Sequence, residues 1–120
     1  MLQELYDAAE IKPVFVQNRF YDKTGHDKDI RNWLKERGIR YQSFWTLTAN
    51  PKLINHKSVL ELALKYEKTK EQIFYRFVQQ LDIVPLSGTT SQAHMVDDLS
   101  LDTFSLESNE IKALLTYFKI

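Results

Sequence analysis

Three short apolar runs, separated by stretches with helical periodicity, constrain the fold of this chain more than any other feature. The runs are residues 13–17, 39–44 and 83–86, and the first is nearly continuous in apolar character. A continuous apolar run of this length is typical of a strand buried on both faces. Strands that alternate with amphipathic helices form βαβ units, so the sequence predicts a parallel sheet with flanking helices.

The stretches between the runs have the spacing and end signals of helices. Residues 2–9 predict a helix before the first strand, and Asp27 is the expected N-cap of a second helix that stops near Gly38. Two helices are expected before the third strand, the later one starting with the capping box Thr69–Gln72. A short helix around residues 93–98 and a last one over 111–118 follow. Three strands in 120 residues fit either a small open α/β sheet or a slice of a larger barrel.

The composition argues against several partners and compartments. Sixteen basic and sixteen acidic residues cancel, so no net charge favours nucleic acid or an anionic membrane. The chain has no cysteine, which rules out disulfides and thiolate metal sites. No apolar span approaches the ~20 residues that cross a bilayer, and the N-terminus does not read as a signal peptide. We expect a cytoplasmic protein of one domain that binds neither nucleic acid nor membrane.

His26, Asp27 and Asp29 stand close together in the sequence and offer the types of side chain that bind metals. The simpler interpretation is the start of a helix with a solvated first turn, and this is the one we favour. We therefore predict no metal site.

A small, hydroxyl-rich segment follows the third apolar run, and a helix is expected shortly after it. Backbone N–H groups and hydroxyls at a helix N-terminus hold phosphate well. The segment therefore predicts a phosphate-binding loop. Its candidate residues are Ser87, Gly88, Thr89 and Thr90.

Taken in order, the ends of the three runs resemble the C-terminal part of the aldo-keto reductases, whose fold is the (β/α)8 TIM barrel. The resemblance covers roughly residues 1–118 and implies a partial barrel of about three parallel strands with their helices. Residues 1–120 would then be the C-terminal part of one NADP-dependent oxidoreductase domain, with no second domain.

The resemblance also implies a site for NADP(H). Gln17 falls where the family's glutamine hydrogen-bonds the nicotinamide carboxamide, and Phe44 where an aromatic ring stacks on the nicotinamide. The residues after Phe44 would lie along the pyrophosphate, although Trp45 and Thr46 depart from the family's usual Ser-Pro. These residues are Trp45, Thr46, Leu47 and Thr48. The adenosine end would be held by Ser87, Gly88, Thr89, Thr90, His94, Asp97 and Asp98.

Two departures bear on the choice of cofactor. Leu86 stands where the family has a lysine, and His94 stands where it has an arginine. A 2′-phosphate is best held by such strong cations, so their loss weakens the preference for NADP(H). NADP(H) is the expected cofactor, with NAD(H) as the alternative.

The resemblance implies that the intact parent reduces aldehydes or ketones. The family's catalytic tyrosine, lysine, aspartate and histidine lie on the first four strands, upstream of the matched part, so we assign no catalytic residue and expect no turnover by this chain alone. A cut barrel exposes strand edges, which would bind the missing N-terminal half or a second copy. The alternative is a non-catalytic nucleotide-binding or protein-interaction module, or the remnant of a truncated gene.

Overall fold

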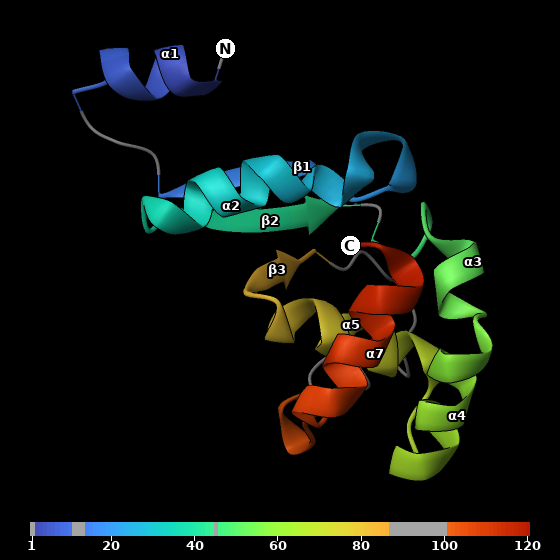
Figure 1. Cartoon of the computed structure of the whole chain (residues 1–120). Helices are drawn as coiled ribbons and strands as arrows, with labels where there is room; N and C mark the ends of the chain where they lie inside the picture. The colour runs from blue at the N-terminus through green and yellow to red at the C-terminus, as the bar shows by residue number, and fades with distance from the viewer. Residues whose placement is uncertain (1, 11–13, 45, 87–100) are drawn as a thin grey trace.

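The computed structural model describes residues 2–10, 14–44, 46–86 and 101–120, which form strands and helices in alternation (Figure 1). The candidate residues Trp45, Ser87–Thr90, His94, Asp97 and Asp98, and the helix expected around 93–98, lie outside this part. The elements in chain order are α1 (Leu2–Ala8), β1 (Phe15–Arg19), the 3-10 helix η1 (Asp22–Asp27), α2 (Lys28–Glu36), β2 (Arg40–Phe44), α3 (Pro51–Ile54), α4 (Lys57–Tyr66), α5 (Lys70–Gln80), β3 (Ile83–Pro85), η2 (Leu101–Thr103) and α7 (Ser108–Phe118).

The described strands form one parallel sheet in the order β1-β2-β3. Parallel neighbours require a crossover connection, and α2 provides it between β1 and β2, while α3, α4 and α5 lie between β2 and β3. The parallel sheet with flanking helices predicted from the sequence is confirmed.

One face of the sheet is covered by helices and forms the core. Side chains alternate along a strand, and the register places Tyr41 between Val16 and Ile83 on the covered face. Tyr41 and Ile83 are buried in one cluster with side chains from the helices. Figure 1 shows α2 lying along β1 and β2, with α5 next to β3 and α4 on the far side of α5 and α7. The helical members that are completely shielded from solvent are Leu34, Ile73, Phe74, Phe77 and Val78.

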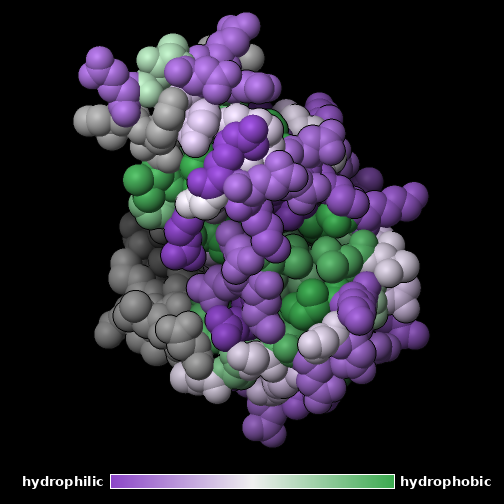
Figure 2. Space-filling view, turned by 60° about the vertical axis from the view of Figure 1, so that its left-hand side comes forward, coloured by the Kyte–Doolittle hydropathy of each residue, from purple (hydrophilic) through white to green (hydrophobic). Residues whose placement is uncertain are grey.

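The strand β1 differs from the expectation that it is buried on both faces. Phe15 is 51% exposed and Gln17 is also exposed, whereas Val16 is partly buried against the core. The face opposite the helices is therefore open at β1 among the described residues. Figure 2 shows one face of the molecule, in which hydrophobic residues form patches between larger hydrophilic areas.

Helix ends follow the expected signals with one exception. Thr69 accepts from the Gln72 N–H at 3.1 Å, and the Gln72 side chain accepts from the Thr69 N–H at 2.9 Å, so the predicted capping box is present. Gly38, at φ +68°, follows α2 in the left-handed conformation that glycine adopts without strain. Asp27 precedes α2 but makes no side-chain capping bond, which corrects the prediction of an Asp27 N-cap.

A polar link joins α4 to α7. The Glu110 carboxylate accepts from the Lys65 ammonium at 2.9 Å and from the Tyr66 hydroxyl, and it also accepts from the Glu107 N–H at 2.8 Å. These bonds lower the pKa of Glu110 against the opposing effect of burial. Glu110 thus caps the start of α7 and binds two side chains of α4.

No helix in the described part is long and apolar enough to cross a membrane.

Candidate functional site

The carboxyl edge of the sheet is the candidate site. The parallel strands β1, β2 and β3 end at Arg19, Phe44 and Pro85, so their ends lie along the same edge. In parallel α/β sheets and barrels, ligands bind at this edge, where the loops that follow the strands converge. The Leu86 N–H donates to the Ser43 carbonyl at 2.8 Å, which carries the end of β3 alongside β2.

Gln17 and Phe44 lie on the same face of the sheet. Gln17 is in register with Gln42, and Arg19 with Phe44, while the residues between them face the helices. Gln17 is exposed and Phe44 partly buried, so both are on the open side rather than in the core. The structure thus brings together two residues that lie 27 positions apart in the sequence.

Thr46, Leu47 and Thr48, in the loop after β2, differ in exposure. The Thr46 hydroxyl is buried against the Ser43 hydroxyl at 2.8 Å, and Leu47 packs against the core. Thr48 is exposed. Any ligand contact from Thr46 would therefore use its backbone, and Thr48 alone of these three offers a free-standing surface side chain.

Asn50 ties this loop to the loop that follows β1. Its amide nitrogen donates to the Phe20 carbonyl at 2.6 Å and to the Thr46 carbonyl at 2.8 Å. Its amide oxygen lies 2.8 Å from His26 Nε2. Because the amide nitrogen faces two acceptors, the oxygen must accept, and His26 therefore carries a proton on Nε2. Asn50 and His26 are each 3% exposed, so the link is shielded from water.

A second buried polar group stands beside the first. Asp27 accepts on Oδ2 from the Tyr41 hydroxyl at 2.6 Å and from the Asn18 amide at 2.7 Å. Burial, followed by the bond to Asp27, raises the pKa of Tyr41, which therefore stays protonated and donates. Arg31 Nε donates to the His26 carbonyl at 2.9 Å. These bonds fix the segment between β1 and α2 against the covered face.

The structure corrects the interpretation of His26 and Asp27 as part of a solvated helix start. Both side chains are buried, and both residues have left-handed backbones, each with φ +53°. Aspartate and histidine tolerate that region better than most residues. A Gly25-His26 step after a polar loop hinted at a tight turn, but no local pattern indicated partners as distant as Tyr41 and Asn50. No group of three or more metal-binding side chains occurs among the described residues.

Acid is expected to destabilise the fold through His26. Burial lowers the pKa of His26, and the hydrogen bond to Asn50 offsets only part of that effect. The unfolded chain then binds a proton more readily than the folded chain, so stability is complete above pH ~6.5 and is lost as the pH falls below it, by at most ~1.4 kcal/mol per pH unit. Urea unfolding at pH 5 to 8 measures this slope, and His26→Gln should flatten it. An equal slope in both proteins would rule out His26 as the cause.

The known proteins that are similar to this chain include several reductases and oxidoreductases. No family model matches the chain. An uncharacterized oxidoreductase, YtbE, of Bacillus subtilis is 25% identical over 94% of this chain and 40% of its own length. Glyoxal reductase of the same organism is 24% identical over 92% of this chain and 39% of its own length. An NAD(P)H-dependent D-xylose reductase of Kluyveromyces lactis is 24% identical over 95% of this chain and 39% of its own length. The chain spans about two fifths of these relatives.

Solved structures share the fold. An aldo-keto reductase from a Medee basin deep-sea metagenome library superposes with a TM-score of 0.82 at 20% identity, over 96% of this chain and 43% of that one. A mutant of Gox0644 in complex with NADPH superposes with a TM-score of 0.81 at 18% identity, over 94% of this chain and 41% of that one. The three parallel strands with their helices match part of that larger fold, as the sequence predicted.

Proposed function

We propose that this chain, which is related to the aldo-keto reductases over a part of their length, is their C-terminal, cofactor-binding part. Its ligand is NADP(H), with NAD(H) as the alternative, and the intact parent reduces aldehydes or ketones in the cytoplasm. The 120 residues act as one domain and do not complete the reaction by themselves, because the resemblance places the family's catalytic tyrosine, lysine, aspartate and histidine upstream of the matched part.

The observation that carries the proposal is the common position of Gln17 and Phe44. Both lie on the open face, close to the carboxyl edge, and β3, which precedes the hydroxyl-rich residues 87–90 in the sequence, ends at the same edge. An exposed amide and a flat ring on one face are the groups that a nicotinamide needs, one for its carboxamide and one for its ring.

The chain's own groups would bind and orient the cofactor. Gln17 can both donate to and accept from a carboxamide, and Phe44 gives a face for stacking. The loop of residues 46–50 is held by the buried Asn50 bonds, so its backbone is fixed before a ligand arrives. When bound, the dinucleotide supplies hydride transfer chemistry, which these residues position rather than perform.

The names of the relatives support the cofactor. One is an NAD(P)H-dependent reductase, and one solved structure of the same fold holds NADPH. Glyoxal reductase among the relatives agrees with carbonyl reduction by the parent.

A titration with NADPH tests the proposal. NADPH fluorescence should rise on binding, without consumption of glyoxal or xylose. Gln17→Ala should weaken binding roughly 5- to 10-fold, the equivalent of one ordinary hydrogen bond. Gln3→Ala, at an exposed glutamine on α1, is the matched control and should bind as the unmodified chain does. If the unmodified chain binds no NADPH, or the two variants bind alike, the proposed site is wrong.

A second function has one observation in its favour. Val14 and Phe15, at the outer strand of the described sheet, are 63% and 51% exposed. Apolar side chains beside an edge strand suit a protein-interaction module. Its partner would be the missing N-terminal half or a second copy of the chain, bound at this edge. The same titration separates the functions, because such a module would leave NADPH fluorescence unchanged and would sediment as an assembly.

A further inference from the structure

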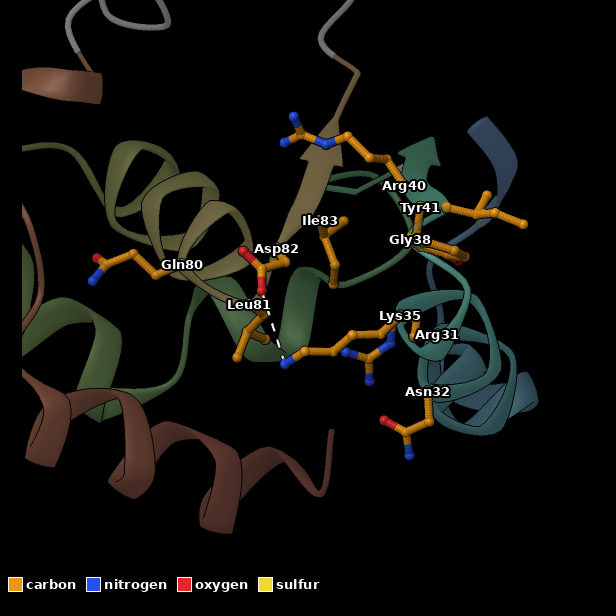
Figure 3. Close-up of a pocket in the computed structure, with 11 residues that line it drawn as sticks. Arg31, Asn32, Lys35, Gly38, Arg40, Tyr41, Gln80, Leu81, Asp82 and Ile83 are labelled. Atoms are coloured by element: carbon orange, nitrogen blue, oxygen red, sulfur yellow. Dashed lines mark ion pairs between the residues drawn. The ribbon is translucent and has the colours of Figure 1, made fainter. Parts of the chain in front are cut away.

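A pocket of about 550 Å3 opens at the opposite, amino end of the sheet, away from Gln17 and Phe44 (Figure 3). It lies between the end of α2 and the end of α5, above the first residues of β2 and β3. Ligand pockets of small molecules usually fall between roughly 300 and 1,000 Å3, so this one has the size to hold a small organic ligand.

The pocket has an apolar part beside a larger polar one. Ile39, Tyr41 and Ile83 line it and are buried, and Leu81 adds a partly exposed apolar side chain. Burial of an apolar group against such a surface is favourable by about 25 cal/mol per Å2 of area removed from water. The pocket can therefore take the apolar body of a ligand.

One wall of the pocket is cationic. Arg31 and Lys35 both line it from α2, where their spacing of four residues places them one turn apart on the same side. Figure 3 shows the Lys35 ammonium extended toward Asp82, while Arg40 points away from it. Arg31 is partly buried, and burial lowers its pKa, although Tyr41 and Asp27 oppose that effect.

The facing carboxylate leaves Lys35 available. The Lys35 ammonium and the Asp82 carboxylate are 3.9 Å apart, and their side chains are 77% and 80% exposed. An ion pair this open is weak, because water and salt screen both charges. An anion that reaches Lys35 and Arg31 together can replace the Asp82 carboxylate as the partner of Lys35.

From this combination we infer that the pocket between α2 and α5 binds a small organic anion, with an apolar body against Leu81 and the adjoining edges of Ile39 and Ile83, and a phosphate or carboxylate head against Arg31 and Lys35. The guanidinium of Arg31 suits such a head group because it offers several donors in a fixed plane. This ligand site is independent of the proposed cofactor site, which lies at the other end of the strands.

Phenyl phosphate is a suitable probe, since it joins an apolar ring to an anionic head. Its binding is followed by shifts of the Gly38 amide, which lines the pocket, in two-dimensional NMR spectra. Inorganic phosphate and phenol, the two halves of the probe, should each bind at least tenfold more weakly. Gln17→Ala should leave the Gly38 shifts with phenyl phosphate unchanged, which separates this site from the cofactor site.

Four variants give the pattern that supports the inference. Lys35→Gln and Arg31→Gln should each weaken phenyl phosphate binding fivefold or more, whereas Lys112→Gln, at an exposed lysine on α7, should not change it. Asp82→Asn should tighten binding about twofold, because it removes a competing negative charge; asparagine tolerates the left-handed backbone at this position, φ +62°. Equal affinity in Lys35→Gln, Asp82→Asn and Lys112→Gln, or no Gly38 shift at millimolar probe, would overturn the inference.

Discussion

Replacement of Asn50 by alanine is expected to lower the free energy of unfolding by about 3–5 kcal/mol, a large share of the stability of a domain this small. The substitution leaves the His26 N–H and the carbonyls of Phe20 and Thr46 without the partner that they have at 2.6–2.8 Å. Each buried polar group that loses its partner costs about 1–3 kcal/mol. Water has little access to replace Asn50 here, because Asn50, His26, Phe20 and Thr46 are all buried.

Asn55 gives a matched control five residues away, at the other end of α3. Its amide nitrogen donates to the Pro51 carbonyl at 2.8 Å, and its oxygen accepts from the Lys70 ammonium at 2.6 Å, yet its side chain is exposed. Asn55→Ala should therefore cost no more than ~1 kcal/mol, because water replaces both partners. Urea unfolding followed by circular dichroism compares the two variants. Similar losses in both would show that burial of the Asn50 bonds does not govern stability.

Replacement of Phe77 by alanine is expected to cost about 3–5 kcal/mol and to leave much of the chain unfolded at 37 °C. Phe77 is completely buried, with its ring centroid 6.2 Å from that of Phe74 and 6.0 Å from that of Phe118. The lost side chain removes both contacts and leaves a cavity at the point where α5 meets α7.

Tyr117 supplies the control for Phe77 on the outer side of α7. Its ring stacks at 5.4 Å on His56, but the residue is 60% exposed. Tyr117→Ala should change the free energy of unfolding by less than ~1 kcal/mol, because most of its surface is already in water. Thermal unfolding by calorimetry measures both. A Phe77→Ala variant that melts within a few degrees of the Tyr117→Ala variant would contradict this account of the core.

Much of the fold was predictable because its signals are local. A capping box needs only two side chains three residues apart, so Thr69 and Gln72 mark the start of α5 in the sequence as clearly as in the structure. The strands were likewise marked by apolar runs, and their alternation with helices indicates a parallel sheet. Whether one or both faces of each strand are covered was harder to predict. An apolar run does not distinguish a strand covered on both sides from β1, where Phe15 is exposed in the described structure.

The candidate site was predictable only in part, for a different reason. Gln17 and Phe44 were identified by resemblance, and the register of β1 and β2 then places them on one face. Some of the buried bonds beneath them join residues that are far apart in the sequence, 14 positions for Asp27 with Tyr41 and 30 for Asn50 with Phe20. Such a partnership depends on tertiary packing, so no spacing rule in the sequence indicates it.

The sheet register also determines how this chain must reach its folded state. Phe15 pairs with Arg40 and Tyr41 with Ile83, so the paired residues lie 25 and 42 positions apart in the sequence, and neither pair of strands is joined by a short turn. Closing long loops costs chain entropy before any strand contact forms, whereas α4 and α5 pack together as near neighbours in the chain. We therefore expect the pair of helices α4 and α5 to form first and the sheet that supports the candidate site to form later, with its strand edges open to other molecules until then.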